Sequence, residues 1–133
     1  MARRAPTTED LDFEIRFCEG YLAKRPDFLP TLILLGDLYT RRGHFEKGLT
    51  MDERLAQLLP DDPMVFYNLA CSYSLLSRVE EALSAMKTAI ALGYDDFKHL
   101  GQDRDLENLF KDSRFRDYLT RLKEKSIPAE NRE

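Results

Sequence analysis

Apolar residues recur at steps of three and four positions through most of this 133-residue chain. The pattern is clearest at Leu32, Leu35 and Leu38, and side chains with this spacing share one face of an α-helix. Similar stretches follow one another along the chain, separated by short polar or glycine-containing interruptions. The pattern therefore predicts an all-α fold made of amphipathic helices.

The apolar pattern occurs twice, with a period of 34 residues. The segment TLILLGDLYTRRGHFEKGL in the first copy corresponds to VFYNLACSYSLLSRVEEAL in the second. A fixed period of this length is typical of stacked helical hairpins. The corresponding pairs are Leu32 and Phe66, Leu35 and Leu69, Gly36 and Ala70, Tyr39 and Tyr73, Gly48 and Ala82, Leu49 and Leu83, Leu55 and Ala89, and Leu58 and Leu92.

Several residues mark helix ends and close contacts between helices. Gly43 is expected just beyond the end of a helix, because glycine adopts positive φ without steric cost. Asp62 can cap the next helix, and Pro63 can take its first position. Gly36 and Ala70 are expected where two helices approach closely, because a larger side chain would push the helices apart.

The repeated pattern, large–x2–Leu–small–x2–Tyr followed by a small residue, resembles the tetratricopeptide repeat (TPR) signature. Pro60 closes the first copy as in that family, whereas Tyr94 stands in the equivalent place of the second. The register also extends backwards, so residues 8–24 resemble the second helix of a partial repeat, with Thr8 near an acidic helix start. The resemblance implies an α-α superhelix, a TPR solenoid of antiparallel helix hairpins.

The C-terminal part departs from the repeat and resembles the end of many small bacterial TPR proteins. The resemblance implies short capping helices, since an end repeat otherwise exposes its apolar face. Aromatic and aliphatic residues from Phe97 to Leu122 are expected to cover the last hairpin. The residues that match the C-terminal pattern of those TPR proteins are Asp103, Asp105, Leu106, Leu109, Asp112, Arg114, Phe115 and Leu119.

We therefore expect one TPR domain over residues 1–133. It comprises a half-repeat helix over 8–24, full repeats over 29–62 and 63–96, capping helices over 97–124 and a flexible tail over 125–133. Asp52 departs from the family pattern, because its position usually carries a large apolar residue. Its packing therefore calls for a local explanation.

In the TPR family the first helix of each repeat lines a concave side that binds an extended or helical peptide. Tyr67 stands out on this lining, because an aromatic ring with a polar tip suits an interface. Ile33 and Tyr67 are also compatible with a purely structural place in the core. Carried onto this chain, the resemblance implies a partner-binding stripe of Ile33, Asp37, Arg41, Met64, Tyr67, Asn68, Cys71 and Lys98.

One TPR subtype clamps a C-terminal carboxylate with lysine, asparagine and arginine side chains. Only Asn68 and Lys98 agree with that set, while Ile33 and Gln102 do not. Asp37 would repel a carboxylate. We therefore do not expect a carboxylate clamp.

Composition and charge narrow the function classes. The formal net charge is −4 and basic residues alternate with acidic ones, which argues against a nucleic-acid partner. No stretch approaches the roughly 20 apolar residues of a membrane span, and the N-terminus is a poor signal peptide. Cys18 and Cys71 form no CxxC motif, which suits a reducing compartment. We expect a cytoplasmic protein without a membrane partner.

Catalytic, metal and cofactor sites are not expected. The two histidines, His44 and His99, fall in a hairpin turn and in the cap, and neither has a zinc-ligand partner four residues on. His99 with Asp103 could hold a metal, but a surface position in the cap is the preferred interpretation. Cys71 has no activating base beside it in the sequence, and there is no glycine-rich phosphate loop.

The leading hypothesis is a non-catalytic adaptor or co-chaperone-like scaffold that binds a protein or peptide ligand on its concave face. The alternative is a structural protein that forms a homodimer through its N-terminal end or its groove. Phe13 and Phe17 on the unpaired first helix motivate that alternative. An enzyme is the least favoured class, because no residue cluster suggests a reaction.

Overall fold

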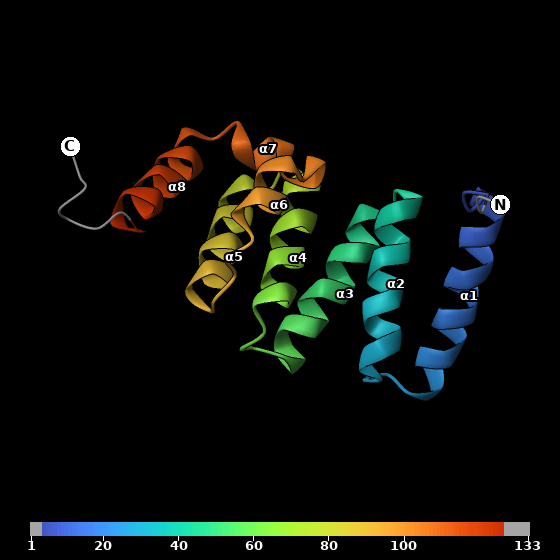
Figure 1. Cartoon of the computed structure of the whole chain (residues 1–133). Coiled ribbons are helices and arrows are strands. Elements are labelled where there is room, and N and C mark those ends of the chain that lie inside the picture. The colour runs from blue at the N-terminus through green and yellow to red at the C-terminus, as the bar shows by residue number, and fades with distance from the viewer. Residues whose placement is uncertain (1–3, 127–133) are drawn as a thin grey trace.

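A computed structural model describes residues 4–126, and these residues form α-helices and one 3-10 turn with no strand (Figure 1). The all-α prediction is confirmed. The elements are α1 (Thr8–Lys24), α2 (Leu29–Arg42), α3 (Phe45–Leu58), α4 (Pro63–Leu75), α5 (Val79–Ala91), α6 (Phe97–Gln102), η1 (Arg104–Leu106), α7 (Glu107–Phe110) and α8 (Ser113–Ser126). The predicted tail began at residue 125, but α8 extends to Ser126, and residues 127–133 lie outside the described part.

The helix ends agree with the local chemistry of the sequence. Thr7 caps α1 in a capping box with Asp10, which satisfies two free backbone N–H groups. Asp62 caps α4 by accepting a bond from the Met64 amide at 2.9 Å, and Pro63 occupies the first turn, as predicted. Gly43 ends α2 with a φ of 87°, which confirms its predicted left-handed conformation.

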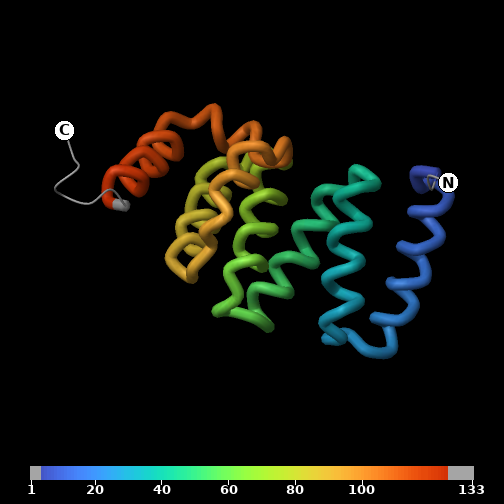
Figure 2. Tube along the Cα trace, viewed as in Figure 1, coloured from blue at the N-terminus to red at the C-terminus, as the bar shows by residue number. Residues whose placement is uncertain are grey.

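Consecutive helices pack against one another from α1 to α5, so the chain forms an extended row of helices (Figures 1 and 2). Glycine residues permit a close approach between α2 and α3. A Cβ atom added to Gly48 would lie 2.9 Å from the Thr40 hydroxyl, and one added to Gly36 would lie 3.4 Å from the Met51 Cβ. Gly48 therefore leaves no room for a Cβ atom, whereas a Cβ atom at Gly36 would make an ordinary van der Waals contact.

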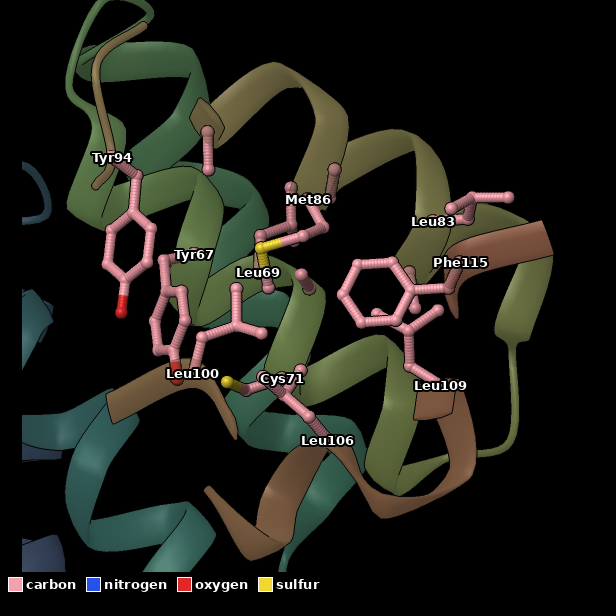
Figure 3. Close-up of a cluster of buried hydrophobic side chains, with 14 of the residues drawn as sticks. Tyr67, Leu69, Cys71, Leu83, Met86, Tyr94, Leu100, Leu106, Leu109 and Phe115 are labelled. Atoms are coloured by element: carbon pink, nitrogen blue, oxygen red, sulfur yellow. The ribbon is translucent and has the colours of Figure 1, made fainter. Parts of the chain in front are cut away.

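The C-terminal segment folds back onto the last helix pair. Segments α6, η1 and α7 lie beside α4 and α5, and their apolar side chains complete one buried cluster (Figure 3). Leu100, Leu106 and Leu109 are almost fully buried there. The buried Ser74 hydroxyl accepts a bond from the Leu109 amide at 3.2 Å, which joins α4 to α7. Phe97 is 45% exposed, so it contributes less to the cover than expected.

Asp52 is buried between α3 and α4, where a repeat of this pattern usually has an apolar side chain. The Ser72 hydroxyl donates a hydrogen bond to its carboxylate. Burial raises the pKa of Asp52 to about 6, while the Ser72 bond opposes that shift. The hydrogen bond from Ser72 on the next helix therefore explains how an aspartate can occupy this buried position.

Candidate functional site

A groove opens between α2 and α4, with the α6–η1 segment along its edge. Its volume is about 520 Å³. Successive helices supply its walls because each packs against the next, which brings residues far apart in sequence to one surface. The lining residues are Pro30, Ile33, Leu34, Gly36, Asp37, Thr40, Asp52, Leu55, Met64, Tyr67, Asn68, Cys71, Ser72, Leu75, His99, Asp103 and Asp105.

Exposed apolar side chains form one part of this groove. Ile33 is 51% exposed, Leu34 is 44% exposed and Met64 is 49% exposed. Within residues 4–126, most other large apolar side chains are buried in the core clusters or are partly buried against them. An apolar surface in a concave site is a usual place for a ligand to dock.

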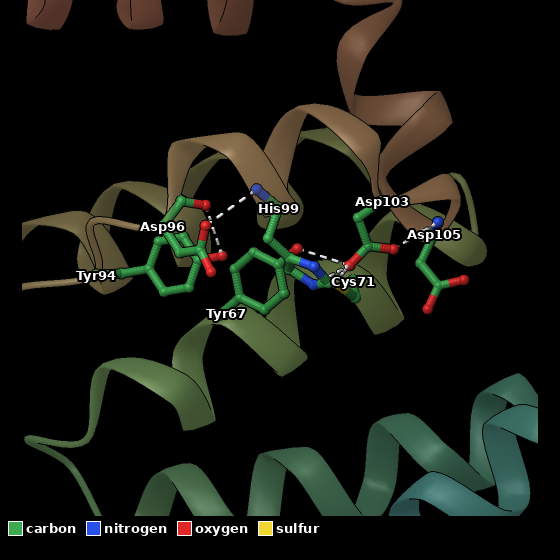
Figure 4. Close-up of polar contacts among 7 residues, drawn as sticks. All are labelled: Tyr67, Cys71, Tyr94, Asp96, His99, Asp103 and Asp105. Carbon is green, nitrogen blue, oxygen red and sulfur yellow. Dashed lines mark hydrogen bonds and ion pairs between the residues drawn. The ribbon is translucent and has the colours of Figure 1, made fainter.

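Tyr67 lies at the back of the groove and is only 2% exposed. Its hydroxyl donates a hydrogen bond to Asp103 Oδ2 at 2.6 Å, and its ring stacks on Tyr94 with centroids 4.4 Å apart (Figure 4). The His99 ring lies tilted beside it at 5.8 Å. The sequence analysis predicted Tyr67 on an accessible stripe. That prediction of accessibility is wrong, because α6 and η1 fold back and cover the ring.

Cys71 is also buried, against the expectation of an accessible groove residue. Its thiol lies 3.8 Å from Asp103 Oδ2 and donates a weak hydrogen bond to it. Burial, followed by the charges of Asp103 and Asp105, raises the pKa of Cys71 far above its usual range. The thiol is therefore protonated and poorly nucleophilic.

Asp103 organises the edge of the groove. Its Oδ1 accepts a bond from the Asp105 amide at 3.0 Å, and its Oδ2 lies 3.4 Å from His99 Nε2 (Figure 4). Burial first, then the charges of Asp103 and Asp37, raise the pKa of Asp105. Three carboxyl groups from two different segments thus share this end of the groove.

One potential ligand atom from each of Cys71, Asp103 and Asp105 lies within 4.8 Å of the others. This is the grouping that a small metal ion would require. However, Asp103 Oδ2 already accepts bonds from Tyr67 and Cys71, and Cys71 is held in its neutral form. The observed contacts are those of a hydrogen-bonded cluster that fixes the position of the Asp103 carboxylate.

The structure brings together most of the predicted stripe. Ile33, Asp37, Met64 and Asn68 line the groove, and Tyr67 and Cys71 form its buried back. Two predicted residues lie outside the lining. Arg41 makes an exposed ion pair with Asp37 at 3.4 Å, and Lys98 is exposed on α6.

Sequence reasoning missed Leu34, His99, Asp103 and Asp105 as groove residues. It assigned the last three to the cap, because they follow the second repeat and belong to no periodic stripe. Two aspartates one residue apart, Asp103 and Asp105, are a visible signal. Only the return of this segment across α4 turns that signal into part of a surface.

Comparison with known proteins identifies a similar curated sequence from a plant. Over 95 residues the chain is 36% identical to a protein of Arabidopsis thaliana that is named as chloroplastic. The match covers 67% of this chain and 28% of that protein, so the chain spans only a minor part of its relative's length. No family model and no solved structure matches the chain. Within residues 4–126, none of the helices combines the length and hydrophobicity needed to cross a membrane.

Proposed function

We propose that this chain is a TPR-type module that binds another polypeptide in the groove between α2 and α4. The observation that carries the proposal is the exposed apolar surface of Ile33, Leu34 and Met64 inside a concave site. The 34-residue pattern and the packing of consecutive helices support the TPR assignment. The buried cluster at the back of the groove also favours a non-catalytic scaffold. The Cys71 thiol there is buried and protonated, and the Asp103 carboxylate accepts hydrogen bonds from Tyr67 and Cys71.

A paired substitution tests this function. Ile33→Ala with Met64→Ala removes most of the exposed apolar surface without opening the core. We expect the double variant to recover several-fold less of the partner in affinity capture from the native cell, because apolar anchors dominate such contacts. The recovered proteins are quantified by mass spectrometry.

Phe97→Ala provides the control, because this exposed aromatic residue on α6 does not line the groove. If the groove variant and the control recover the same partners in the same amounts, the groove is not the binding site. Tyr67→Ala is unsuitable for this purpose, since it removes a buried ring and leaves Asp103 without its 2.6 Å hydrogen bond.

The location of the protein belongs to the same proposal. The sequence predicts the cytoplasm, while the similar Arabidopsis thaliana protein is named as chloroplastic. We keep the cytoplasm as the proposed location, with a plastid as the alternative. Fluorescence microscopy of the tagged full-length protein in its native cell decides between the two.

A second candidate function is self-association through α1. Phe13 is 64% exposed and Phe17 is 69% exposed, and the two lie one helical turn apart. Exposed aromatic pairs of this kind are often covered by a partner. This candidate describes a structural homodimer, in which the groove has no required role.

A further inference from the structure

The groove between α2 and α4 is acidic as well as apolar. Four aspartates lie in its lining, namely Asp37, Asp52, Asp103 and Asp105. Of the described lining residues, none is a lysine or an arginine, and His99 alone could carry a positive charge. The groove therefore has an uneven charge that a ligand could complement.

Asp105 lies close enough to Asp103 and Asp37 for their charges to disfavour its ionised form. The charges of Asp103 and Asp37 both raise the pKa of Asp105, after burial, which has the larger effect. A positive group placed among them would relieve this repulsion. Arg41 does so in part for Asp37 at 3.4 Å, but both side chains are exposed and such pairs contribute little. Displacement of Arg41 from Asp37 by a ligand cation would therefore cost little free energy.

The apolar and polar positions of the groove have a regular spacing. Ile33 precedes Asp37 by one helical turn on α2, and Met64 precedes Asn68 by one turn on α4. One turn corresponds to about 5–6 Å along the helix. Ile33 therefore lies one helical turn from the Asp37 carboxylate, and Met64 lies one helical turn from the Asn68 amide.

We propose that the groove binds a polypeptide segment in which a lysine or arginine lies next to an apolar residue. The apolar side chain contacts Ile33 and Met64, and the cation lies between Asp37 and Asp105, beside the hydrogen-bonded Asp103. This inference rests on the proposed function, because it specifies the ligand of the same groove. The same carboxylates repel acidic peptides and nucleic acids.

Selection from a random peptide library displayed on phage, against the whole immobilised chain, tests the inference. We expect the enriched peptides to combine lysine or arginine with a neighbouring apolar residue. The most enriched peptide is then synthesised and its affinity measured by fluorescence anisotropy. Raising the ionic strength from about 0.1 M to about 1 M shortens the Debye length from about 10 Å to about 3 Å, so the affinity should fall.

Asp37→Asn with Asp105→Asn removes two groove charges, and no side-chain hydrogen bond to another residue of the groove's buried cluster depends on them. We expect this variant to bind the peptide about tenfold more weakly or worse. Glu14→Gln with Asp117→Asn is the matched control, because it changes the net charge equally at exposed positions on α1 and α8. The control should bind like the wild type, and circular dichroism should show all proteins equally helical.

Four outcomes overturn the inference, and they distinguish its failure from the failure of the proposed function. If the enriched peptides lack basic residues, and only the Ile33→Ala with Met64→Ala variant fails to bind them, the inference is wrong. The proposed polypeptide-binding function is then still supported. Peptides that bind every groove variant equally, or a library that yields no enrichment, argue against both. A wild-type dimer that Ile33→Ala with Met64→Ala dissociates in sedimentation would make a second copy the occupant.

Discussion

Asp52 illustrates how one residue can depart from a pattern without breaking the fold. The position lies inside the helix row, where burial disfavours a charged carboxylate. Ser72 from the next helix donates a hydrogen bond to it, and the pKa rises to about 6. The carboxyl group of Asp52 therefore titrates near pH 6 instead of near its ordinary pKa of 3.8.

The raised pKa predicts how stability depends on pH. In the unfolded chain Asp52 titrates near its ordinary pKa of 3.8, so between about pH 4 and pH 6 the folded state binds the proton more tightly. The contribution of Asp52 to the free energy of unfolding therefore falls as the pH rises through this window and stays low above it. Asp52→Asn, which is always neutral, should be more stable than the wild type at pH 7, by up to about 3 kcal/mol.

Urea denaturation at several pH values checks this prediction. The difference between Asp52→Asn and the wild type should shrink towards about pH 4.5, where Asp52 is largely protonated when folded. Asp117→Asn, at an exposed position on α8, serves as the control. A difference that is independent of pH would show that the folded pKa of Asp52 is not raised.

At the scale of elements, the C-terminal segment both covers the core and shapes the groove. Leu106 in η1 is fully buried against the last helix pair. The same short element places Asp103 and Asp105 at the edge of the groove. The same few residues of the C-terminal segment therefore both cover the hydrophobic core and form the edge of the groove.

Leu106→Ala tests this coupling. Removing a fully buried leucine leaves a cavity, so the free energy of unfolding should fall by about 2–5 kcal/mol. Phe97→Ala, on the exposed side of α6, should change it by less than about 1 kcal/mol. Chemical denaturation measures both. Equal small effects would mean that η1 is not firmly packed on α4.

At the scale of the whole molecule, the helix row has one end covered by the folded-back segment and the other formed by α1 (Figure 1). The second helix covers one face of α1, where Ile15 and Cys18 are buried with Leu35 and Leu38. Phe13 and Phe17 lie on the opposite, exposed side. This asymmetry motivates self-association as the second candidate function.

Sedimentation velocity at several micromolar concentrations tests that candidate. The wild type should sediment as a dimer, and Phe13→Ala with Phe17→Ala should shift it to a monomer, because the substitutions remove the shared apolar surface. Ile33→Ala with Met64→Ala should leave the dimer intact. A monomeric wild type at every concentration rejects dimerisation through α1.

Much of this molecule follows from local sequence. Apolar spacing identified the helices, and Asp62, Pro63 and Gly43 marked their ends, because helix periodicity and capping depend on residues within one or two turns. The resemblance to the TPR family indicated Ile33, Asp37, Met64 and Asn68, and these four residues line the groove. The TPR assignment and the partner class stay predictions.

Tertiary structure alone decided which of these residues a ligand can reach. Tyr67 and Cys71 share a helix face with Met64, yet the return of α6 and η1 buries them and brings Asp103 and Asp105 to the groove. Periodicity places a side chain on a face of its helix, whereas burial depends on segments that pack there from more than 30 residues away. The sequence by itself determined the helices and their apolar faces, and long-range packing determined the surface that remains.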